Sequence, residues 1–319
     1  MSPPRIAVVG AGYMGLRHAR KLAELAREGA IRLAGVQDLD PERARAVAHE
    51  LDAPVLSDLA AVCGGADAAC VAVPTREHRA IAERLLGAGL DVLLEKPIAS
   101  TREEARALID ITRRRQRILQ IGHVERFSSP LRRVLPLLSR PRFIEAHRIG
   151  PYPARGTDVG VVLDLMIHDL DIVARLAGAD VERVEAVGIP VLSTTEDIAN
   201  ARVRFTNGCI LNITASRVSL EKLRKIRVFQ ADAYLSIDLG RGKITVVRRE
   251  GDPRTGESAK IHAENLELDV SDALLEQTRA FVRAVRGREV PQVTGEDGYR
   301  ALDLALRIQE SLPPVEELL

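Results

Sequence analysis

The chain has 319 residues, which is too long for one domain of ordinary size and fits two. It carries 46 Lys and Arg against 45 Asp and Glu, and only 3% of its residues are aromatic, so it lacks the charge and the stacking residues of a nucleic-acid binder. Three cysteines without a C-x-x-C spacing argue against a disulfide framework or a zinc knuckle, and no apolar run is long enough to span a membrane. We therefore expect a cytoplasmic protein without a bound metal.

Short apolar runs alternate with helical patterns in the first 120 or so residues. We predict strands at 6–9, 33–36, 69–73, 92–94 and 118–121, separated by helices at 16–28, 41–51, 77–87 and 102–115. Strand and helix alternation with continuously apolar strands is typical of a parallel sheet covered on both faces. We assign residues 1–122 to such a parallel sheet, in an α/β chain.

The pattern changes after residue 122. We predict strands at 142–149, 184–190, 201–205, 209–217, 225–230, 234–238 and 243–248, and helices at 160–177, 272–286 and 296–311. Asn207-Gly208 between two of these strands is a strong hairpin signal, and residues 251–258 have the composition of a loop. The pattern therefore predicts that residues 123–319 form an α+β domain with a largely antiparallel sheet.

A glycine-rich turn joins the first strand to the first helix. Gly10, Gly12 and Gly15 form G-x-G-x-x-G around Ala11, Tyr13 and Met14, in the strand-to-helix context that indicates a dinucleotide site. Asp38 ends the second strand, about 20 residues further on, where a carboxylate binds ribose hydroxyls and repels a 2′-phosphate. This favours NAD, although Arg43 and Arg45 nearby leave NADP open. The alternative is a purely structural turn with Asp38 as a solvated strand end.

Lys96 lies in Glu95-Lys96-Pro97, directly after the strand at 92–94. Loops at the carboxyl ends of parallel strands line the ligand crevice, so Lys96 is expected beside the cofactor. The bond from Lys96 to Pro97 is a candidate for the cis form. A surface lysine before a helix is the alternative interpretation.

The predicted helix at 160–177 is apolar on nearly every side except for one polar stripe. Asp164, His168, Asp171 and Arg175 form this stripe. Asp164 and His168 are one turn apart, so the carboxylate is placed to orient the imidazole and raise its basicity, as a general base requires. A buried structural network or a solvent-facing stripe remains the alternative.

Together these motifs resemble the glucose–fructose oxidoreductase, inositol dehydrogenase and MocA (Gfo/Idh/MocA) family. The resemblance rests on the phosphate loop followed by His18, on Pro74-Thr75-x-x-His78, on Glu95-Lys96-Pro97 and on Asp164-x-x-x-His168. It implies a nicotinamide-dependent oxidation of a sugar or cyclitol hydroxyl, with His168 as base, Asp164 as its partner and Lys96 at the reacting hydroxyl and the nicotinamide. It also implies that residues 1–122 form a doubly wound Rossmann domain. The open sheet of the C-terminal domain would form an oligomer, a homo-dimer or homo-tetramer. The implied cofactor contacts are the phosphate loop with Tyr13 and Met14, then Asp38, Pro74, Thr75, His78, Glu95 and Lys96.

A narrower resemblance points to the UDP-N-acetylglucosamine 3-dehydrogenase branch, which serves lipid A synthesis. It rests on Gly122–Phe127, Asp164–Asp169, Glu196–Ala201 and Ser216–Gln230, whereas Ser128-Ser129 departs from the Asn-Pro usual there. A UDP diphosphate needs cations, for which Arg126 and Arg155 are our candidates. Further cations are Arg148, Arg217, Lys222, Arg224 and Lys225. Another sugar or cyclitol dehydrogenase, such as one for inositol, and a non-catalytic NAD-binding sensor are the alternatives.

Overall fold

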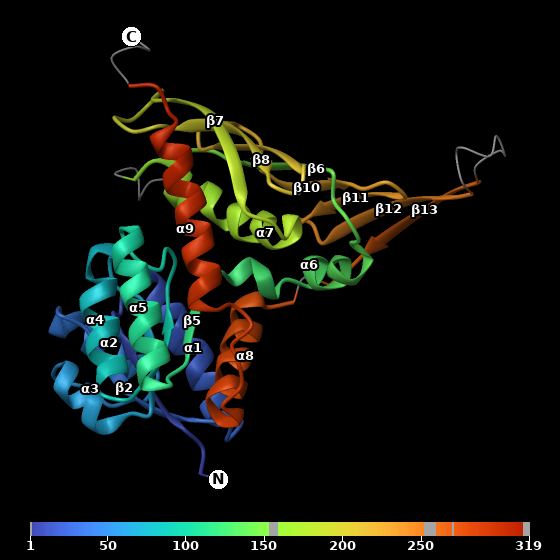
Figure 1. Cartoon of the computed structure of the whole chain (residues 1–319). Helices are drawn as coiled ribbons and strands as arrows, with labels where there is room; N and C mark the ends of the chain where they lie inside the picture. Colours follow the sequence, from blue (N-terminus) through green and yellow to red (C-terminus); the bar gives the residue numbers. More distant parts are fainter. Residues whose placement is uncertain (1, 153–158, 252–259, 270, 315–319) are drawn as a thin grey trace. The chain divides into compact units, whose positions relative to one another are not determined.

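The computed structural model describes residues 2–152, 159–251, 260–269 and 271–314. The chain forms two compact units (Figure 1). The first unit comprises Met1–Val124 and Asp272–Leu302, and the second comprises Glu125–Ser271 and Asp303–Leu319. Among the described helices, none has the length and apolar character needed to cross a membrane.

The first unit is built on a five-stranded sheet, sheet A, in which all strands are parallel. Its strands in chain order are β1 (Arg5–Val9), β2 (Arg32–Gln37), β3 (Ala68–Val71), β4 (Asp91–Leu94) and β5 (Leu119–Ile121). The spatial order is β2-β1-β3-β4-β5, so the direction of winding reverses between β1 and β3. The carboxyl ends of these two strands therefore mark the place where an α/β sheet binds its ligand.

Helices connect the strands of sheet A: α1 (Tyr13–Arg27), α2 (Pro41–Glu50), α3 (Leu59–Gly65), α4 (Thr75–Gly87) and α5 (Arg102–Arg115). Side chains cap three of their amino ends: Asp40 accepts from two backbone N–H groups of α2, Asp58 from one of α3 and Thr101 from one of α5. The predicted strands and helices of this half are confirmed, and α3 was missed because it spans only seven residues. The expected doubly wound Rossmann sheet is confirmed.

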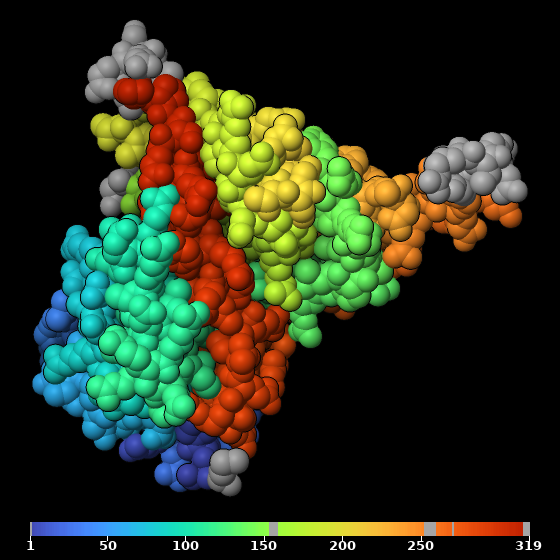
Figure 2. All heavy atoms as spheres, viewed as in Figure 1, coloured from blue at the N-terminus to red at the C-terminus, as the bar shows by residue number. Residues whose placement is uncertain are grey.

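A late segment of the chain returns to the first unit. Helix α8 (Ala273–Gly287) packs against α1, where Phe281 and Val282 join the apolar cluster formed by α1 and sheet A. Figure 2 shows this orange-red segment packed against the blue residues of the same unit. The first break falls between Val124 and Glu125, close to the expected one at 122. The expected continuous second domain differs from the structure, because the apolar face of α8 is buried in the first unit.

The second unit contains an eight-stranded sheet, sheet B, in the order β13-β12-β11-β10-β6-β9-β8-β7. Its strands are β6 (Phe143–Ile149), β7 (Val181–Ile189), β8 (Ile198–Phe205), β9 (Ile210–Ser216), β10 (Leu223–Phe229), β11 (Ala233–Asp238), β12 (Lys243–Glu250) and β13 (Lys260–Glu267). Only β6 and β9 pair in parallel, so the predicted largely antiparallel sheet is confirmed. The Asn207-Gly208 hairpin is confirmed between β8 and β9, with Gly208 in the left-handed region. Strand β13 was not predicted, and the expected loop at 251–258 lies outside the described residues except for Gly251.

One face of sheet B is covered by helices. The covering elements are α6 (Ser129–Val134), the π-helical turn η3 (Val162–Met166) and α7 (Ile167–Ala177), as Figure 1 shows for α6 and α7. Along β6, Ile144 and Ala146 are buried, whereas Phe143, Glu145 and His147 on the opposite face stay partly exposed. Two 3₁₀ turns, η1 (Val124–Phe127) and η2 (Leu135–Leu137), flank α6, and α9 (Gly295–Glu310) spans residues of both units.

Candidate functional site

The phosphate loop runs from Gly10 to Gly15 at the carboxyl end of β1. Gly10 has a φ of +87°, and a Cβ there would lie 2.5 Å from the carbonyl oxygen of Ala72. A Cβ on Gly15 would overlap the carbonyl oxygen of Gly10. Both positions therefore require glycine, for a tight turn and for close packing of α1 on the sheet.

Gly12 differs from these two glycines. It caps the amino end of α1 without a side-chain hydrogen bond, and a Cβ placed on it would meet no atom within 4 Å. The first turn of α1 also carries no acidic residue. The amino end of α1, with the positive end of its dipole, thus has no side-chain cap and has open space beside Gly12, as a pyrophosphate site requires.

Asp38 connects the end of β2 to this loop. Its Oδ2 accepts from the backbone N–H of Ala11 at 2.6 Å, and its Oδ1 accepts from the backbone N–H of Asp40 at 2.8 Å. The Arg43 guanidinium is 3.5 Å from Oδ1, so the nearby cation is paired with the carboxylate. The carboxylate keeps acceptor capacity for ribose hydroxyls, because each oxygen has two lone pairs.

The Glu95-Lys96-Pro97 turn follows β4, and its Lys96–Pro97 bond is cis. Lys96 is partly exposed and Glu95 is buried. The Glu95 Oε1 lies 2.6 Å from Nε2 of His18 on α1, and Oε2 accepts from the backbone N–H of Lys96 at 3.2 Å. Burial acts to raise the pKa of Glu95, but the hydrogen bond and charge of His18, together with the charge of Lys96, hold it below its usual range.

His78 on α4 contacts the same turn from another side. Its Nδ1 is 2.8 Å from the carbonyl oxygen of Pro97 and its Nε2 is 3.0 Å from that of Val73. Burial lowers the pKa of His78, and a neutral imidazole donates only one of these two contacts. His78 therefore links the loops that follow β3 and β4, while Pro74 and Thr75 form the exposed and half-buried start of α4.

The carboxyl edge of sheet A thus fits a dinucleotide such as NAD. The pyrophosphate would lie at the amino end of α1 beside Gly12, and the ribose would reach Asp38. Tyr13, 60% exposed, and the partly buried Met14 stand at the same helix start. The two residues are therefore placed where the sequence predicts cofactor contacts.

Asp164 and His168 lie in the second unit, on consecutive turns. Asp164 belongs to η3, and His168 belongs to the first turn of α7; both side chains are half-buried in a largely apolar element that also carries Asp169, Asp171 and Arg175. A π-helical turn inside a helix is frequent at functional sites. The predicted polar stripe is not uniform, because Asp171 is buried whereas Arg175 is exposed.

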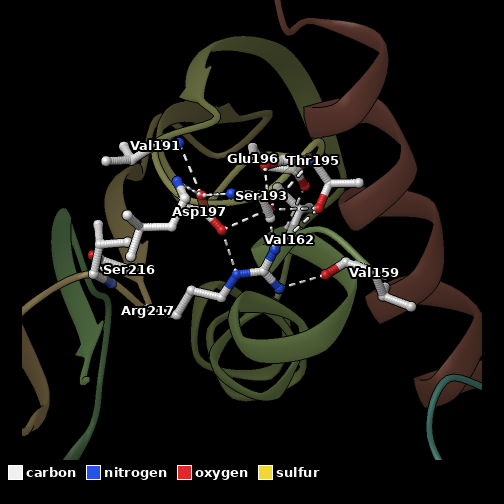
Figure 3. Close-up of polar contacts among 11 residues, drawn as sticks. Val159, Val162, Val191, Ser193, Thr195, Glu196, Asp197, Ser216 and Arg217 are labelled. Atoms are coloured by element: carbon white, nitrogen blue, oxygen red, sulfur yellow. Dashed lines mark hydrogen bonds and ion pairs between the residues drawn. The ribbon is translucent and has the colours of Figure 1, made fainter. Parts of the chain in front are cut away.

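A buried network holds the start of this helical element (Figure 3). The Arg217 guanidinium donates to Oδ1 of Asp197 at 2.6 Å and to the carbonyl oxygen of Val159 at 2.7 Å. Glu196 accepts from the backbone N–H of Val162 at 3.3 Å and fills the space beside Gly160, where a Cβ would overlap it. The peptide segments before and after Gly160 are therefore fixed by residues from the end of β9 and the loop before β8.

Asp197 organises this network. Its Oδ2 accepts from the backbone N–H groups of Val191, Leu192 and Ser193, and Ser193 Oγ donates to its Oδ1 at 2.7 Å. Burial acts to raise the pKa of Asp197, but these backbone amides and the Arg217 guanidinium hold it far below its usual range. The segment Glu196–Ala201, which carried part of the sequence resemblance, thus has a structural role at the base of the helix.

Three of the arginines considered for a substrate diphosphate are buried and paired with carboxylates. Arg126 is buried, with its guanidinium 3.3 Å from Asp171, and Arg148 forms two bonds to Asp169 of α7. Arg217 is only 1% exposed. A role of Arg126 in substrate binding stays a prediction, and Arg155 lies outside the described residues. These pairings could not be predicted from local sequence, since the partners are 20 or more residues apart. Charged residues inside the largely apolar helix were the one available signal.

Comparisons with known proteins identify the family to which the chain belongs. The family model described as "Oxidoreductase family, NAD-binding Rossmann fold" matches residues 4–123, and the Gfo/Idh/MocA C-terminal domain matches residues 138–236. The chain belongs to the Gfo/Idh/MocA family of oxidoreductases. It is therefore an NAD-binding oxidoreductase that acts on CH–OH groups.

Two individual relatives match nearly the whole chain and carry the names of two different dehydrogenases. UDP-N-acetylglucosamine 3-dehydrogenase of Acidithiobacillus ferrooxidans is 34% identical over 96% of each chain, and its crystal structure matches this one with a TM-score of 0.90 over 98% of each chain. Inositol 2-dehydrogenase 1 of Saccharopolyspora erythraea is 28% identical and covers 98% of this chain and 96% of its own. Both a nucleotide-sugar dehydrogenase and inositol dehydrogenases are thus relatives over nearly the full length.

Proposed function

We propose that this protein oxidises UDP-N-acetylglucosamine at carbon 3 to the ketone, with NAD as the hydride acceptor. The observation that carries the proposal is the 34% identity to UDP-N-acetylglucosamine 3-dehydrogenase over 96% of both chains. The presence of Lys96, Asp164 and His168 in the expected motifs supports it. It follows that the first unit holds the dinucleotide and the second holds most of the sugar substrate.

His168 is the general base of the proposed reaction. It takes the proton of the sugar hydroxyl, and Asp164, one turn earlier, orients the imidazole and favours its charged form. Lys96 stabilises the negative charge that develops on the same oxygen, through its ammonium group. The phosphate loop, with Tyr13, Met14 and Asp38, would hold NAD, which would supply the hydride acceptor. Pro74, Thr75, His78 and Glu95 shape the cofactor edge around Lys96.

The alternatives to this function are a cyclitol dehydrogenase and a non-catalytic NAD-binding sensor. The relation to inositol 2-dehydrogenase supports oxidation of a free cyclitol by the same residues. A non-catalytic sensor that binds NAD would keep the phosphate loop without needing a base. The three site residues argue against the sensor.

We also propose that sheet B forms a homo-oligomer, a dimer or a tetramer. Its uncovered face carries an aromatic group in which the rings of Phe143 and Phe229 are 5.5 Å apart and those of Phe229 and Tyr234 are 4.9 Å apart. Partly exposed apolar side chains beside polar ones are typical of a protein interface. Light scattering of the purified chain gives the oligomer size.

We propose a cytoplasmic location for this reaction. Cys63, Cys70 and Cys209 are all unpaired, and Cys70 and Cys209 are buried. Reduced cysteines are the normal state of proteins in a reducing compartment.

The substrate is tested by following NADH formation, through its near-ultraviolet absorbance, with a panel of UDP-sugars and free cyclitols. We expect turnover of UDP-N-acetylglucosamine and none of myo-inositol. Turnover of myo-inositol without turnover of any nucleotide sugar selects the cyclitol alternative, and NADH binding without any turnover selects the sensor.

The base assignment is tested with His168→Ala, which we expect to lower kcat by about 10²–10⁴-fold while NADH still binds. His262→Ala, at an exposed histidine of β13, is the matched control. Full turnover by the His168 variant would exclude the assignment.

A further inference from the structure

His18 and Glu95 form a buried pair that has no part in the proposed proton and hydride transfers. His18 lies on the face of α1 that packs on sheet A and has no exposed surface, and Glu95 follows β4. The 2.6 Å contact between Nε2 and Oε1 joins residues 77 positions apart in the sequence. It ties the helix of the phosphate loop to the residue that precedes Lys96.

Three neighbouring groups restrict where the Glu95 carboxylate can lie. Its second oxygen accepts the backbone N–H of Lys96, and a Cβ on Gly122 would come within 2.8 Å of Oε1 and 3.1 Å of the Glu95 Cα. His18, the Lys96 backbone and Gly122 thus enclose the carboxylate on three sides. A buried charge held this closely needs a compensating charge, which His18 provides.

From this geometry we propose that the buried His18–Glu95 pair positions Lys96 and sets the charge around its ammonium group. His18 and Glu95 are then positioning residues, because they act through Lys96. The inference rests on the proposed function only for the catalytic role of Lys96.

The charged groups around the His18–Glu95 pair determine whether each substitution raises or lowers the pKa of Lys96. Cys70 on β3 lies beside His18, and Lys96 and His78 lie within the electrostatic influence of Glu95. The Glu95 carboxylate is therefore shared between the cations of His18 and Lys96. In the alkaline range where Lys96 titrates, the Glu95 carboxylate is ionised, so without the His18 charge the whole carboxylate acts on Lys96 and stabilises its ammonium form. Without the Glu95 charge, that stabilisation is lost.

The test is the acetylation of Lys96 by acetic anhydride, measured across pH by mass spectrometry of the Lys96 peptide. It uses the full chain without substrate, on the wild type, His18→Gln, Glu95→Gln and the exposed control His49→Gln. We expect the pKa of Lys96 to rise by about 0.5–1 unit in His18→Gln, to fall by a similar amount in Glu95→Gln, and to stay unchanged in the control. Shifts in the same direction, or none in either variant, would overturn the proposal.

A double variant covers the case in which a single variant does not fold. His18→Gln with Glu95→Gln removes both charges and leaves no buried charge unpaired, and we expect its Lys96 pKa to fall as in Glu95→Gln. An unchanged pKa in the double variant would overturn the proposal. Since acetylation needs no sugar, the expected shifts together with no turnover of UDP-N-acetylglucosamine would support the pair and contradict the proposed substrate.

Discussion

In the first unit, the backbone shapes the predicted cofactor site: Gly10 and Gly15 allow a tight turn, and the amino end of α1 has no side-chain cap and open space beside Gly12. In the second unit, side chains do the corresponding work, because Arg217, Asp197 and Glu196 hold the start of the helical element with Asp164 and His168. Backbone shape depends on residues close in sequence, whereas the ion pairs join distant ones. Substitutions in the two units should therefore differ in how they affect unfolding free energy and NADH binding.

The largest effect is expected from Arg217→Met. It leaves the Asp197 carboxylate buried without its cation, and breaking a buried pair in this way costs about 3–5 kcal/mol of unfolding free energy. Urea unfolding followed by circular dichroism measures it. The exposed Arg133→Met is the control and should stay within about 0.5 kcal/mol of the wild type. A stability equal to that of the control would show that the second unit does not depend on this pair.

Two glycine variants in the first unit distinguish a glycine needed for folding from one needed for cofactor binding. Gly15→Ala should lose about 1–3 kcal/mol of unfolding free energy, because its Cβ overlaps the backbone of Gly10. Gly12→Ala should lose less than about 1 kcal/mol, yet weaken NADH binding by at least about tenfold, because its Cβ takes the space a pyrophosphate needs. Urea unfolding and fluorescence titration with NADH separate the two. Unchanged NADH affinity in Gly12→Ala would contradict the placement of the phosphates.

The smallest effect concerns the one buried ion pair described at the cofactor edge. Burial acts to lower the pKa of His18, but Cys70 and Glu95 outweigh it and raise the pKa to about 10. A raised pKa stabilises the fold fully below the unfolded value of about 6.5, and this stabilisation is lost as the pH rises toward 10. The stability difference between the wild type and His18→Gln should therefore shrink from pH 6 to pH 10 in urea unfolding. A difference that stays constant or grows would mean that His18 is neutral.

The sequence predicted most of what the backbone determines. The phosphate loop, Asp38 at the strand end and the position of Lys96 after β4 all follow from local spacing and from the geometry of parallel sheets. The Asn207-Gly208 hairpin follows from the same kind of local rule.

What the sequence did not predict depends on distant partners. Arg217 was considered for a diphosphate, whereas the structure buries it against Asp197, because nothing local distinguishes a structural arginine from a ligand-binding one. The same holds for Arg148 with Asp169. The return of α8 to the first unit was missed for a similar reason, since its apolar face fits a core in either unit.

In the proposed reaction, a hydride moves from carbon 3 of UDP-N-acetylglucosamine to NAD. The most direct test uses UDP-N-acetylglucosamine with deuterium at carbon 3 and mass spectrometry of the nicotinamide product. We expect the reduced cofactor to carry the deuterium and turnover to be slower than with the unlabelled sugar. Turnover that yields unlabelled NADH would place the oxidation at another carbon, and the absence of any NADH would contradict the proposed activity.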